Sequence, residues 1–322
     1  MKIVVLDGYT LNPGDLTWDE LKTLGEVTIY DRTDPEDTKL ILERIGDAEV
    51  VLTNKTPLSA DTIEKAPNIG LIAVMATGYN VVDTAKAKEK GIPVCNVPVY
   101  GTAAVAQTAI AMLLEICHHV GEHNRSVQNG DWIKCPDYSY WNYPLIELAG
   151  KTMGIIGLGR IGQRTAAIAQ ALGMKVLAFD TYKNKNLECE TLQYADLDSV
   201  LSSSDVIVMH CPQNAENAKM INRETIAKMK DGVIFINNSR GGLVNEEDLV
   251  EALKSGKIQA AALDVISAEP MAKDSPLLGL PNCIITPHMS WAPLASRARL
   301  LGTVIDDIKA YQAGKPINVV NP

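Results

Sequence analysis

Histidine is the side chain that most often donates a proton near neutral pH, and this chain of 322 residues has only five histidines. His288 follows an apolar run that ends in Thr286-Pro287, and His210 ends another apolar run. Arg240 also follows such a run, and its guanidinium can donate two parallel hydrogen bonds to a carboxylate. Position alone therefore indicates His288 as the proton donor and Arg240 as the residue that binds an anionic substrate.

A carboxylate lies close to His288 in the expected arrangement. Glu269 is on the loop just after Asp264, and ligands of doubly wound sheets bind at the carboxyl ends of the strands. Glu269 beside His288 would favour the imidazolium form and keep a proton available for transfer to a substrate. In the reverse direction the neutral imidazole would accept a proton. The alternative is an incidental pair of strand-end residues.

The other three histidines cluster at the polar end of a predicted helix. His119 and His123 are four residues apart, which is a spacing that can bind a metal ion. No third ligand accompanies them, so we interpret His118, His119 and His123 as a solvated helix end and expect no metal site.

A glycine motif indicates the cofactor. Gly157, Gly159 and Gly162 follow the apolar run 153–156 and open a helical stretch at 163–172. In a dinucleotide-binding βαβ unit the first glycine allows the tight turn, the second lets the backbone approach the pyrophosphate, and the third lets helix and strand pack closely. The helix N-terminus, with Arg160 and Ile161, would then face the phosphates. The alternative is an ordinary glycine turn.

Asp180 follows the next apolar run, 175–179, and is expected to accept hydrogen bonds from the adenosine ribose of NAD. A 2′-phosphate would meet a like charge, which costs about 4 kcal/mol at ~4 Å and an effective dielectric constant near ~20. Lys183 and Lys185 are near enough in sequence to compensate in part, so use of NADP stays open.

These residues must be carried by strands that alternate with helices. Short β-like runs occupy 3–6, 27–30, 50–53, 71–76 and 93–97, and a second series runs from Lys151 through 205–211, 232–239, 259–265 and 283–287. The pattern predicts an α/β protein with two doubly wound parallel-sheet domains, Rossmann-like or flavodoxin-like. Only 34 residues follow His288. We therefore expect a discontinuous substrate-binding domain, 1–100 with 292–322, an inserted NAD-binding domain, 101–291, and the chemistry between them.

Composition limits the partners. The formal net charge is −9 and the pI is near 5.1, which argues against nucleic acid and anionic membrane surfaces. No apolar run reaches the length of a membrane span. The six cysteines show no CxxC pairing and lie in apolar segments, as expected of reduced thiols in a cytoplasmic protein.

One long helix is predicted from Thr102 to Arg125, followed by an irregular segment from Asn129 to Leu148. The protein has only 5% aromatic residues, yet five of them lie in this segment: Trp132, Tyr138, Tyr140, Trp141 and Tyr143. We expect a homodimer in which the helix and arm of 102–148 embrace a second subunit, and Trp141 could then lie over the neighbour's pocket. The alternative is a lid that packs on its own domain.

Together, the glycine motif, Asp180, Ser239-Arg240-Gly241-Gly242, Leu263-Asp264-Val265, Glu269-Pro270 and Thr286-Pro287-His288 resemble the D-isomer-specific 2-hydroxyacid dehydrogenases over essentially the whole chain. The resemblance implies a catalytic triad of Arg240, Glu269 and His288. It also implies that backbone amides of Thr77, Gly78 and Tyr79 hold the substrate carboxylate. Contacts to NAD are implied, or expected from position, for Thr108, His210, Pro212, Asn217, Asn238, Ser239 and Asp264. Asn217 stands where the family commonly has threonine.

Within that family, 51–56 and 141–144 look most like glycerate dehydrogenases, also called hydroxypyruvate reductases. Asn54 or Lys55 would face the C3 end of a small polar 2-oxo acid, and the expected reaction is hydroxypyruvate to D-glycerate. D-lactate dehydrogenase and glyoxylate reductase remain alternatives. The end at Pro322 disfavours phosphoglycerate dehydrogenases, and Glu269, where formate dehydrogenases have an amide, disfavours those enzymes. An NADH-sensing scaffold, like the corepressors of this superfamily, is the alternative of another class.

Overall fold

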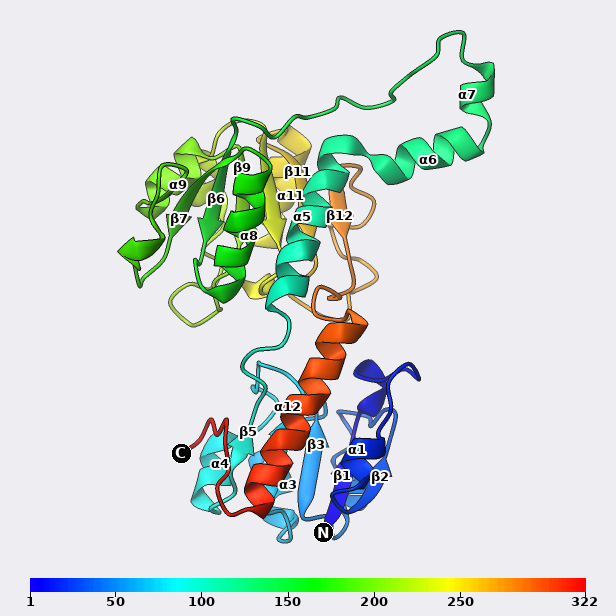
Figure 1. The fold of residues 1–322 in the computed structure, drawn as a ribbon, viewed down its shortest axis with the longest axis vertical. Helices are drawn as coiled ribbons and strands as arrows, with labels where there is room; N and C mark the ends of the chain where they lie inside the picture. The colour runs from blue at the N-terminus through cyan, green and yellow to red at the C-terminus, as the bar shows by residue number, and fades with distance from the viewer. The chain divides into compact units, whose positions relative to one another are not determined.

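The computed structural model describes residues 1–322, which form two compact units (Figure 1). One unit consists of Met1–Gly101 and Ala292–Pro322, and the other of Thr102–Trp291. Each unit has its own parallel β-sheet with helices packed against it, as the alternating pattern predicts.

The discontinuous unit has a five-stranded parallel sheet in the order β2-β1-β3-β4-β5. The strands are β1 (Lys2–Val5), β2 (Glu26–Ile29), β3 (Val50–Thr53), β4 (Leu71–Val74) and β5 (Val94–Cys95). The helices are η1 (Gly8–Thr10), α1 (Asp19–Lys22), α2 (Thr38–Ile45), α3 (Ala60–Lys65), α4 (Thr84–Glu89) and α12 (Leu294–Gln312).

The central strands of this sheet are buried along their whole length, which explains their continuous apolar sequences. Helices α2, α3 and α4 begin at side chains that accept a hydrogen bond from the first turn: Asp37, Ser59 and Asp83. Beyond α12, which packs on β4, the C-terminal residues return to the sheet, where the Val320 N–H donates to the Val94 carbonyl at 2.8 Å. The last 30 residues thus complete the sheet that the first 100 begin.

The continuous unit has a seven-stranded parallel sheet in the order β12-β11-β10-β9-β6-β7-β8. The strands are β6 (Thr152–Ile156), β7 (Lys175–Phe179), β8 (Leu192–Tyr194), β9 (Val206–Met209), β10 (Val233–Asn237), β11 (Ile258–Leu263) and β12 (Cys283–Ile285). Strands β7 and β8 are added on one side of β6, and β9 to β12 on the other. The strand order thus reverses between β6 and β9, which is the point at which a dinucleotide-binding sheet holds its ligand.

The helices of this unit cover both faces of the sheet (Figure 1). They are α5 (Thr102–His118), α6 (Val120–Gln128), α7 (Asp131–Lys134), α8 (Arg160–Ala171), η2 (Lys185–Leu187), α9 (Leu197–Ser203), α10 (Arg223–Lys228), η3 (Gly241–Leu243) and α11 (Glu246–Ser255). Helix α5 packs on α8, β10 and β11, and its residues join one of the two apolar cores that flank the sheet.

The prediction of a single helix from Thr102 to Arg125 is wrong. His119 adopts a left-handed backbone with φ of 49°, so α5 ends at His118 and α6 begins at Val120, bent by 54°. The Glu115 carboxylate accepts from the Gly121 N–H at 3.3 Å and caps the new helix. No single helix is long and apolar enough to span a membrane; the bent α5–α6 pair meets that test only when its two helices are counted together.

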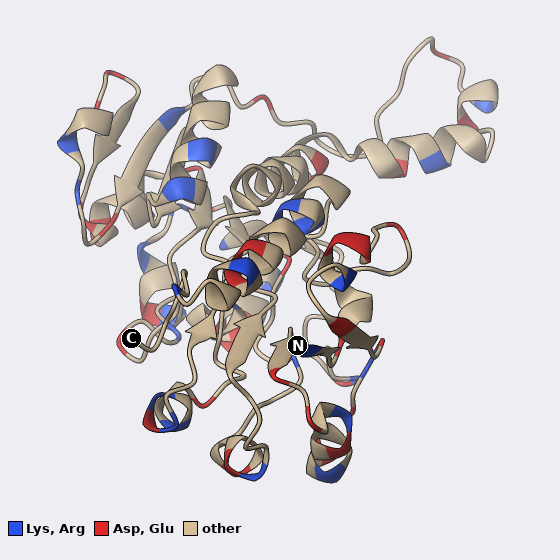
Figure 2. Ribbon diagram, turned by 60° about the horizontal axis from the view of Figure 1, so that its bottom comes forward, with Lys and Arg blue, Asp and Glu red and all other residues tan.

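Helices α6 and α7 and the chain up to residue 147 extend away from the sheet of their own unit (Figure 1). We call residues 119–147 the arm. Several of its apolar side chains are exposed, among them Ile133 by 89% and Tyr138 by 92%. At its base, the ring of His119 stacks on Tyr143 with 4.4 Å between centroids. Elsewhere, many helices of both units carry Lys or Arg together with Asp or Glu (Figure 2).

Candidate active site

His288 and Glu269 lie in contact just beyond the carboxyl ends of β12 and β11. Nδ1 of His288 is 2.7 Å from Oε2 of Glu269, and each side chain is about one-third exposed. The other carboxylate oxygen of Glu269 accepts from the Ile266 N–H at 3.2 Å. Because Glu269 engages Nδ1, the second ring nitrogen, Nε2, is the one that can exchange a proton with a substrate.

Asp264 holds the turn that carries His288. Its side chain is 1% exposed and accepts from Thr286 Oγ1 at 2.5 Å and from the N–H groups of Met289 and Ser290 at 2.8 Å. Between these donors, His288 has a left-handed backbone with φ of 52°, which is unfavourable for a residue with a side chain. The predicted contact of Asp264 with NAD stays a prediction. Its role in shaping the His288 turn was missed, although Thr286 and Ser290 flanking the histidine are a signal for it.

Arg240 is presented by a turn at the end of β10. Asn237, which is fully buried, accepts from the Ser239 N–H at 3.1 Å, and its Nδ2 donates to the Arg240 carbonyl at 2.9 Å. The Arg240 side chain is exposed and forms no ion pair; its Nη1 donates to the Ser239 carbonyl at 2.6 Å. The guanidinium is therefore available to an anionic ligand. Sequence reasoning missed Asn237, whose pairing with the turn depends on backbone geometry.

Gly241 brings this turn next to the loop of Glu269. A Cβ atom at Gly241 would lie 1.9 Å from the carbonyl oxygen of Ile266, a distance that no side chain tolerates. Glycine is therefore required where η3 meets the loop after β11. The structure thus brings two of the three predicted catalytic residues into contact and sets the turn of the third against the same loop.

The glycine loop fits a dinucleotide. Gly157 has φ of 101° and a Cβ there would lie 2.5 Å from the Cys211 nitrogen, while a Cβ at Gly162 would lie 2.1 Å from the Gly157 oxygen. By contrast, Gly159 has open space within 4 Å of its Cβ position. No side chain caps the N-terminus of α8, so the N–H groups at Arg160 and Ile161 are available to a pyrophosphate.

Asp180 braces this loop from the end of β7. One carboxylate oxygen accepts from the Leu158 N–H at 2.7 Å and the other from the Tyr182 N–H at 3.0 Å. Oδ1 also accepts from the Thr181 hydroxyl at 3.5 Å, whereas Oδ2 keeps a lone pair to which a ribose hydroxyl can donate.

Asn238 presents an acceptor with no partner. Its Nδ2 donates to the Val105 carbonyl at 2.9 Å, while its Oδ1 is buried without a hydrogen bond. A buried acceptor of this kind suits an amide donor, such as the carboxamide of nicotinamide.

His210 lies beneath the glycine loop. Its Nε2 is 2.8 Å from the Thr165 hydroxyl of α8, and burial lowers its pKa to about 3, so the ring is neutral. The other predicted contacts are engaged locally: Thr108 donates to the Ala104 carbonyl, and Asn217 donates to the Pro212 carbonyl. Contact of these four residues with the cofactor stays a prediction.

In the discontinuous unit, the loop after β4 offers three free amides. The N–H groups of Thr77, Gly78 and Tyr79 have no hydrogen-bond partner. The loop is held from behind, because Asn96 Nδ2 donates to the Thr77 carbonyl and Thr77 Oγ1 donates to the Val97 carbonyl, both at 2.7 Å. Consecutive free amides of this kind can bind a carboxylate.

Asn54 follows the neighbouring strand β3. Its Nδ2 donates to the Met75 carbonyl at 2.6 Å and the side chain is buried. Lys55 beside it is exposed. A substrate contact of Asn54 stays a prediction.

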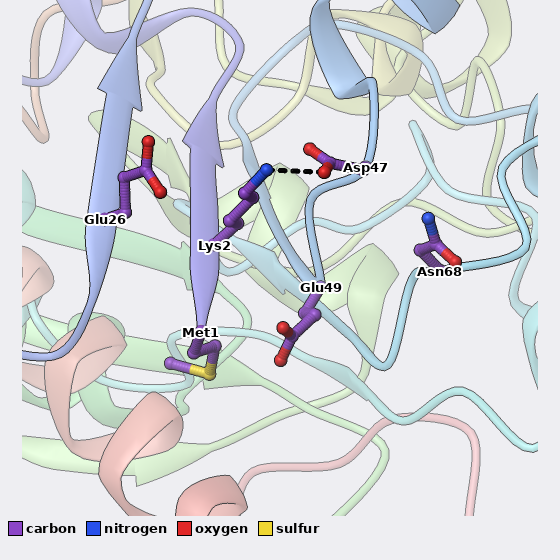
Figure 3. Close-up of a pocket in the computed structure, with 6 residues that line it drawn as sticks. All are labelled: Met1, Lys2, Glu26, Asp47, Glu49 and Asn68. Atoms are coloured by element: carbon purple, nitrogen blue, oxygen red, sulfur yellow. Dashed lines mark hydrogen bonds and ion pairs between the residues drawn. The ribbon is translucent and has the colours of Figure 1, made fainter.

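The same unit has a cavity of about 520 Å³, which lies away from Asn54 and the loop after β4 (Figure 3). It is lined by Met1, Lys2, Glu26, Asp47, Glu49 and Asn68, at the amino ends of β1, β2 and β3. All predicted substrate residues lie at the carboxyl ends, so this cavity is not part of the candidate site.

The strand order, the glycine loop and the histidine–glutamate pair define an NAD-dependent oxidoreductase with a Rossmann-type cofactor domain. Residues 110–290 match the family described as D-isomer specific 2-hydroxyacid dehydrogenase, NAD binding domain. The chain belongs to this family, and the predicted resemblance, enzyme class and cofactor are confirmed.

The chain is 61% identical over 321 residues to a hydroxypyruvate reductase of Blautia hydrogenotrophica, with 100% of both chains covered. It is 41% identical to a glycerate dehydrogenase of Methylorubrum extorquens, covering 99% of this chain and 98% of that one. The solved structure of D-lactate dehydrogenase from Aquifex aeolicus, complexed with NAD and lactic acid, has a TM-score of 0.85 at 30% identity, covering 100% of this chain and 99% of that one.

Proposed function

We propose that this protein is a hydroxypyruvate reductase: hydroxypyruvate, NADH and a proton give D-glycerate and NAD⁺. The observation that carries the chemistry is the 2.7 Å contact between His288 Nδ1 and Glu269, which leaves Nε2 as the proton donor. The substrate rests on the likeness to the Blautia protein of that name over the full length.

The residues divide the work of ketone reduction. When bound, NADH supplies the hydride to the carbonyl carbon. His288 Nε2–H donates its proton to the carbonyl oxygen, and Glu269 holds Nδ1 so that the ring keeps this orientation. The exposed guanidinium of Arg240 is suited to bind a carboxylate, and so, within the other unit, are the free amides at Thr77, Gly78 and Tyr79.

We propose that the enzyme prefers NADH to NADPH. The Asp180 carboxylate braces the glycine loop and so stays at the end of β7, where a 2′-phosphate would meet its negative charge. Lys183 and Lys185 are the cations on the following segment that work against this preference.

We further propose a homodimer formed through α5 and the arm. Support comes from the exposed apolar side chains of the arm, which include Trp132, Ile133, Tyr138 and Trp141. Trp141, 66% exposed, is the residue that we expect to reach a second subunit. We also propose a cytoplasmic location, in keeping with six unpaired cysteines.

The test is the initial rate of NADH loss with hydroxypyruvate, glyoxylate and pyruvate, repeated with NADPH. The proposal expects the highest kcat/KM with hydroxypyruvate and NADH. A higher value with pyruvate would identify a D-lactate dehydrogenase, and one with glyoxylate a glyoxylate reductase. No turnover of any of the three would favour a cofactor-sensing scaffold.

A further inference from the structure

Asp7, at the end of β1, is a buried carboxylate that the proposed mechanism does not use. Its side chain accepts four hydrogen bonds from one loop: Oδ1 from the Asn54 N–H at 2.8 Å, and Oδ2 from the Lys55 N–H at 2.6 Å, the Thr56 N–H at 2.7 Å and the Thr56 hydroxyl at 3.0 Å. The residue is 8% exposed and pairs with no cation. Three consecutive amides and one hydroxyl therefore compensate its charge.

This arrangement fixes the loop after β3. If residues 54–56 changed conformation, a buried carboxylate would lose its partners, which is strongly unfavourable. In addition, Thr53 Oγ1, at the end of β3, donates to the Thr56 carbonyl at 2.6 Å and so ties the loop to its own strand. The loop is thus held in one conformation by its own strand and by β1, which lies next to β3 in the sheet.

The fixed loop exposes one side chain. Asn54 is turned toward the Met75 carbonyl and Thr56 toward Asp7, and both are buried. Lys55, between them, is exposed and forms no ion pair. Its loop follows β3, and the free amides of Thr77, Gly78 and Tyr79 follow β4, the strand that pairs with β3 in register. Lys55 and the predicted carboxylate-binding amides thus both lie at the carboxyl ends of adjacent strands in one sheet.

We propose that Asp7 is a positioning residue that directs Lys55 to the C3 end of the substrate, so that the enzyme favours 2-oxo acids with a hydrogen-bond acceptor at C3. This inference rests on the proposed function. A substrate whose carboxylate is held by the loop after β4 extends its remaining atoms toward neighbouring loops, and the ammonium of Lys55 donates to a hydroxyl there.

Two substrates separate this role from a merely structural one, because glyoxylate has no C3 atom. For Asp7→Asn we expect KM for hydroxypyruvate to rise about tenfold, as for loss of one charge-assisted hydrogen bond, with kcat nearly unchanged. KM for glyoxylate should stay the same. Lys55→Met should give the same pattern, and Asp7→Asn should add nothing to it in the double variant. The control variant is Asp47→Asn, which also removes one negative charge but lies at the amino end of β3.

If Asp7→Asn does not fold, Thr56→Val removes only the hydroxyl bond to Asp7 and should produce a smaller shift in the same direction, again absent when Lys55 is Met. Equal changes of KM for both substrates, or a Lys55→Met variant with unchanged selectivity, would overturn the inference. Failure of this inference can be told apart from failure of the proposed function, because in the second case the unaltered enzyme would not reduce hydroxypyruvate.

Discussion

At His288 two separate carboxylates act on one imidazole. Glu269 hydrogen-bonds to Nδ1 of the ring, and Asp264 accepts hydrogen bonds from the backbone turn that carries His288. The first interaction occupies Nδ1 and leaves Nε2 free, and the second fixes the turn that carries the ring. In the proposed mechanism proton transfer depends on both, because the donor nitrogen must lie within hydrogen-bond reach of the substrate.

Replacing Glu269 by Gln tests the electrostatic part of this arrangement. Glutamine keeps the size and an acceptor oxygen but loses the negative charge beside Nδ1 of His288. We expect kcat/KM for reduction to fall at least about a hundredfold near neutral pH. Initial rates measure this effect, with the exposed Glu247→Gln as control; an unchanged kcat/KM would contradict this role.

Much of the candidate site could be predicted from individual residues and their places in the sequence. His288, Glu269 and Arg240 are recognisable because each follows a strand-like run, and strand ends of a parallel sheet meet at one edge. The positioning residues Asp7, Asp264 and Asn237 could not be assigned their roles. Their hydrogen bonds join segments whose pairing depends on the order of strands or the shape of a turn. Neither of these can be predicted from the residues of a short segment.

At the scale of elements, long-range packing explains where sequence reasoning succeeds and fails. The apolar runs that form β3, β4 and β9 are fully buried strands and were predicted by their composition. The break between α5 and α6 was not, because residues on both sides are compatible with helix and a single left-handed residue, His119, ends the first one.

Helix α12 carries a buried carboxyl group that should make stability depend on pH. Burial raises the pKa of Asp307 to about 6, against 3.8 ordinarily, and one of its oxygens has no partner. The folded protein therefore binds this proton more tightly than the unfolded chain does. The resulting stabilisation is fully present below pH 3.8 and is lost as the pH rises through about 6.

Asp307→Asn should remove this dependence, because the amide stays neutral and still accepts from Asn318. We expect the free energy of unfolding near neutral pH to rise by up to roughly 3 kcal/mol, with little change in acid. Urea unfolding as a function of pH measures it, and the exposed Asp274, which belongs to the other unit, serves as control through Asp274→Asn. A variant as pH-dependent as the original would refute the assignment.

For the whole molecule, the class of fold was predictable, since strands alternate with helices in two series and both sheets are parallel. The order of strands within each sheet was not, because pairing joins residues far apart in sequence. The arm could be predicted as an aromatic segment, but its extension away from its own sheet is a property of the structure (Figure 1).

The arm gives a prediction about assembly. Ile133→Asp places a charge at the most exposed aliphatic position of the segment. If the arm covers a second subunit, this variant should sediment as a monomer, while the unaltered protein sediments as a dimer. Lys134→Asp, next to it, controls for the added charge. Equal sedimentation of Ile133→Asp and the unaltered protein would exclude this residue from the interface.

The central claim is that His288 donates the proton in a reaction for which NADH binds independently of it. The most direct measurement pairs turnover of hydroxypyruvate with titration of NADH binding in His288→Ala, with the exposed His118→Ala as control. We predict a loss of kcat of at least about a thousandfold, with the Kd for NADH within about twofold of the unaltered enzyme. Near-normal turnover in His288→Ala would contradict the account.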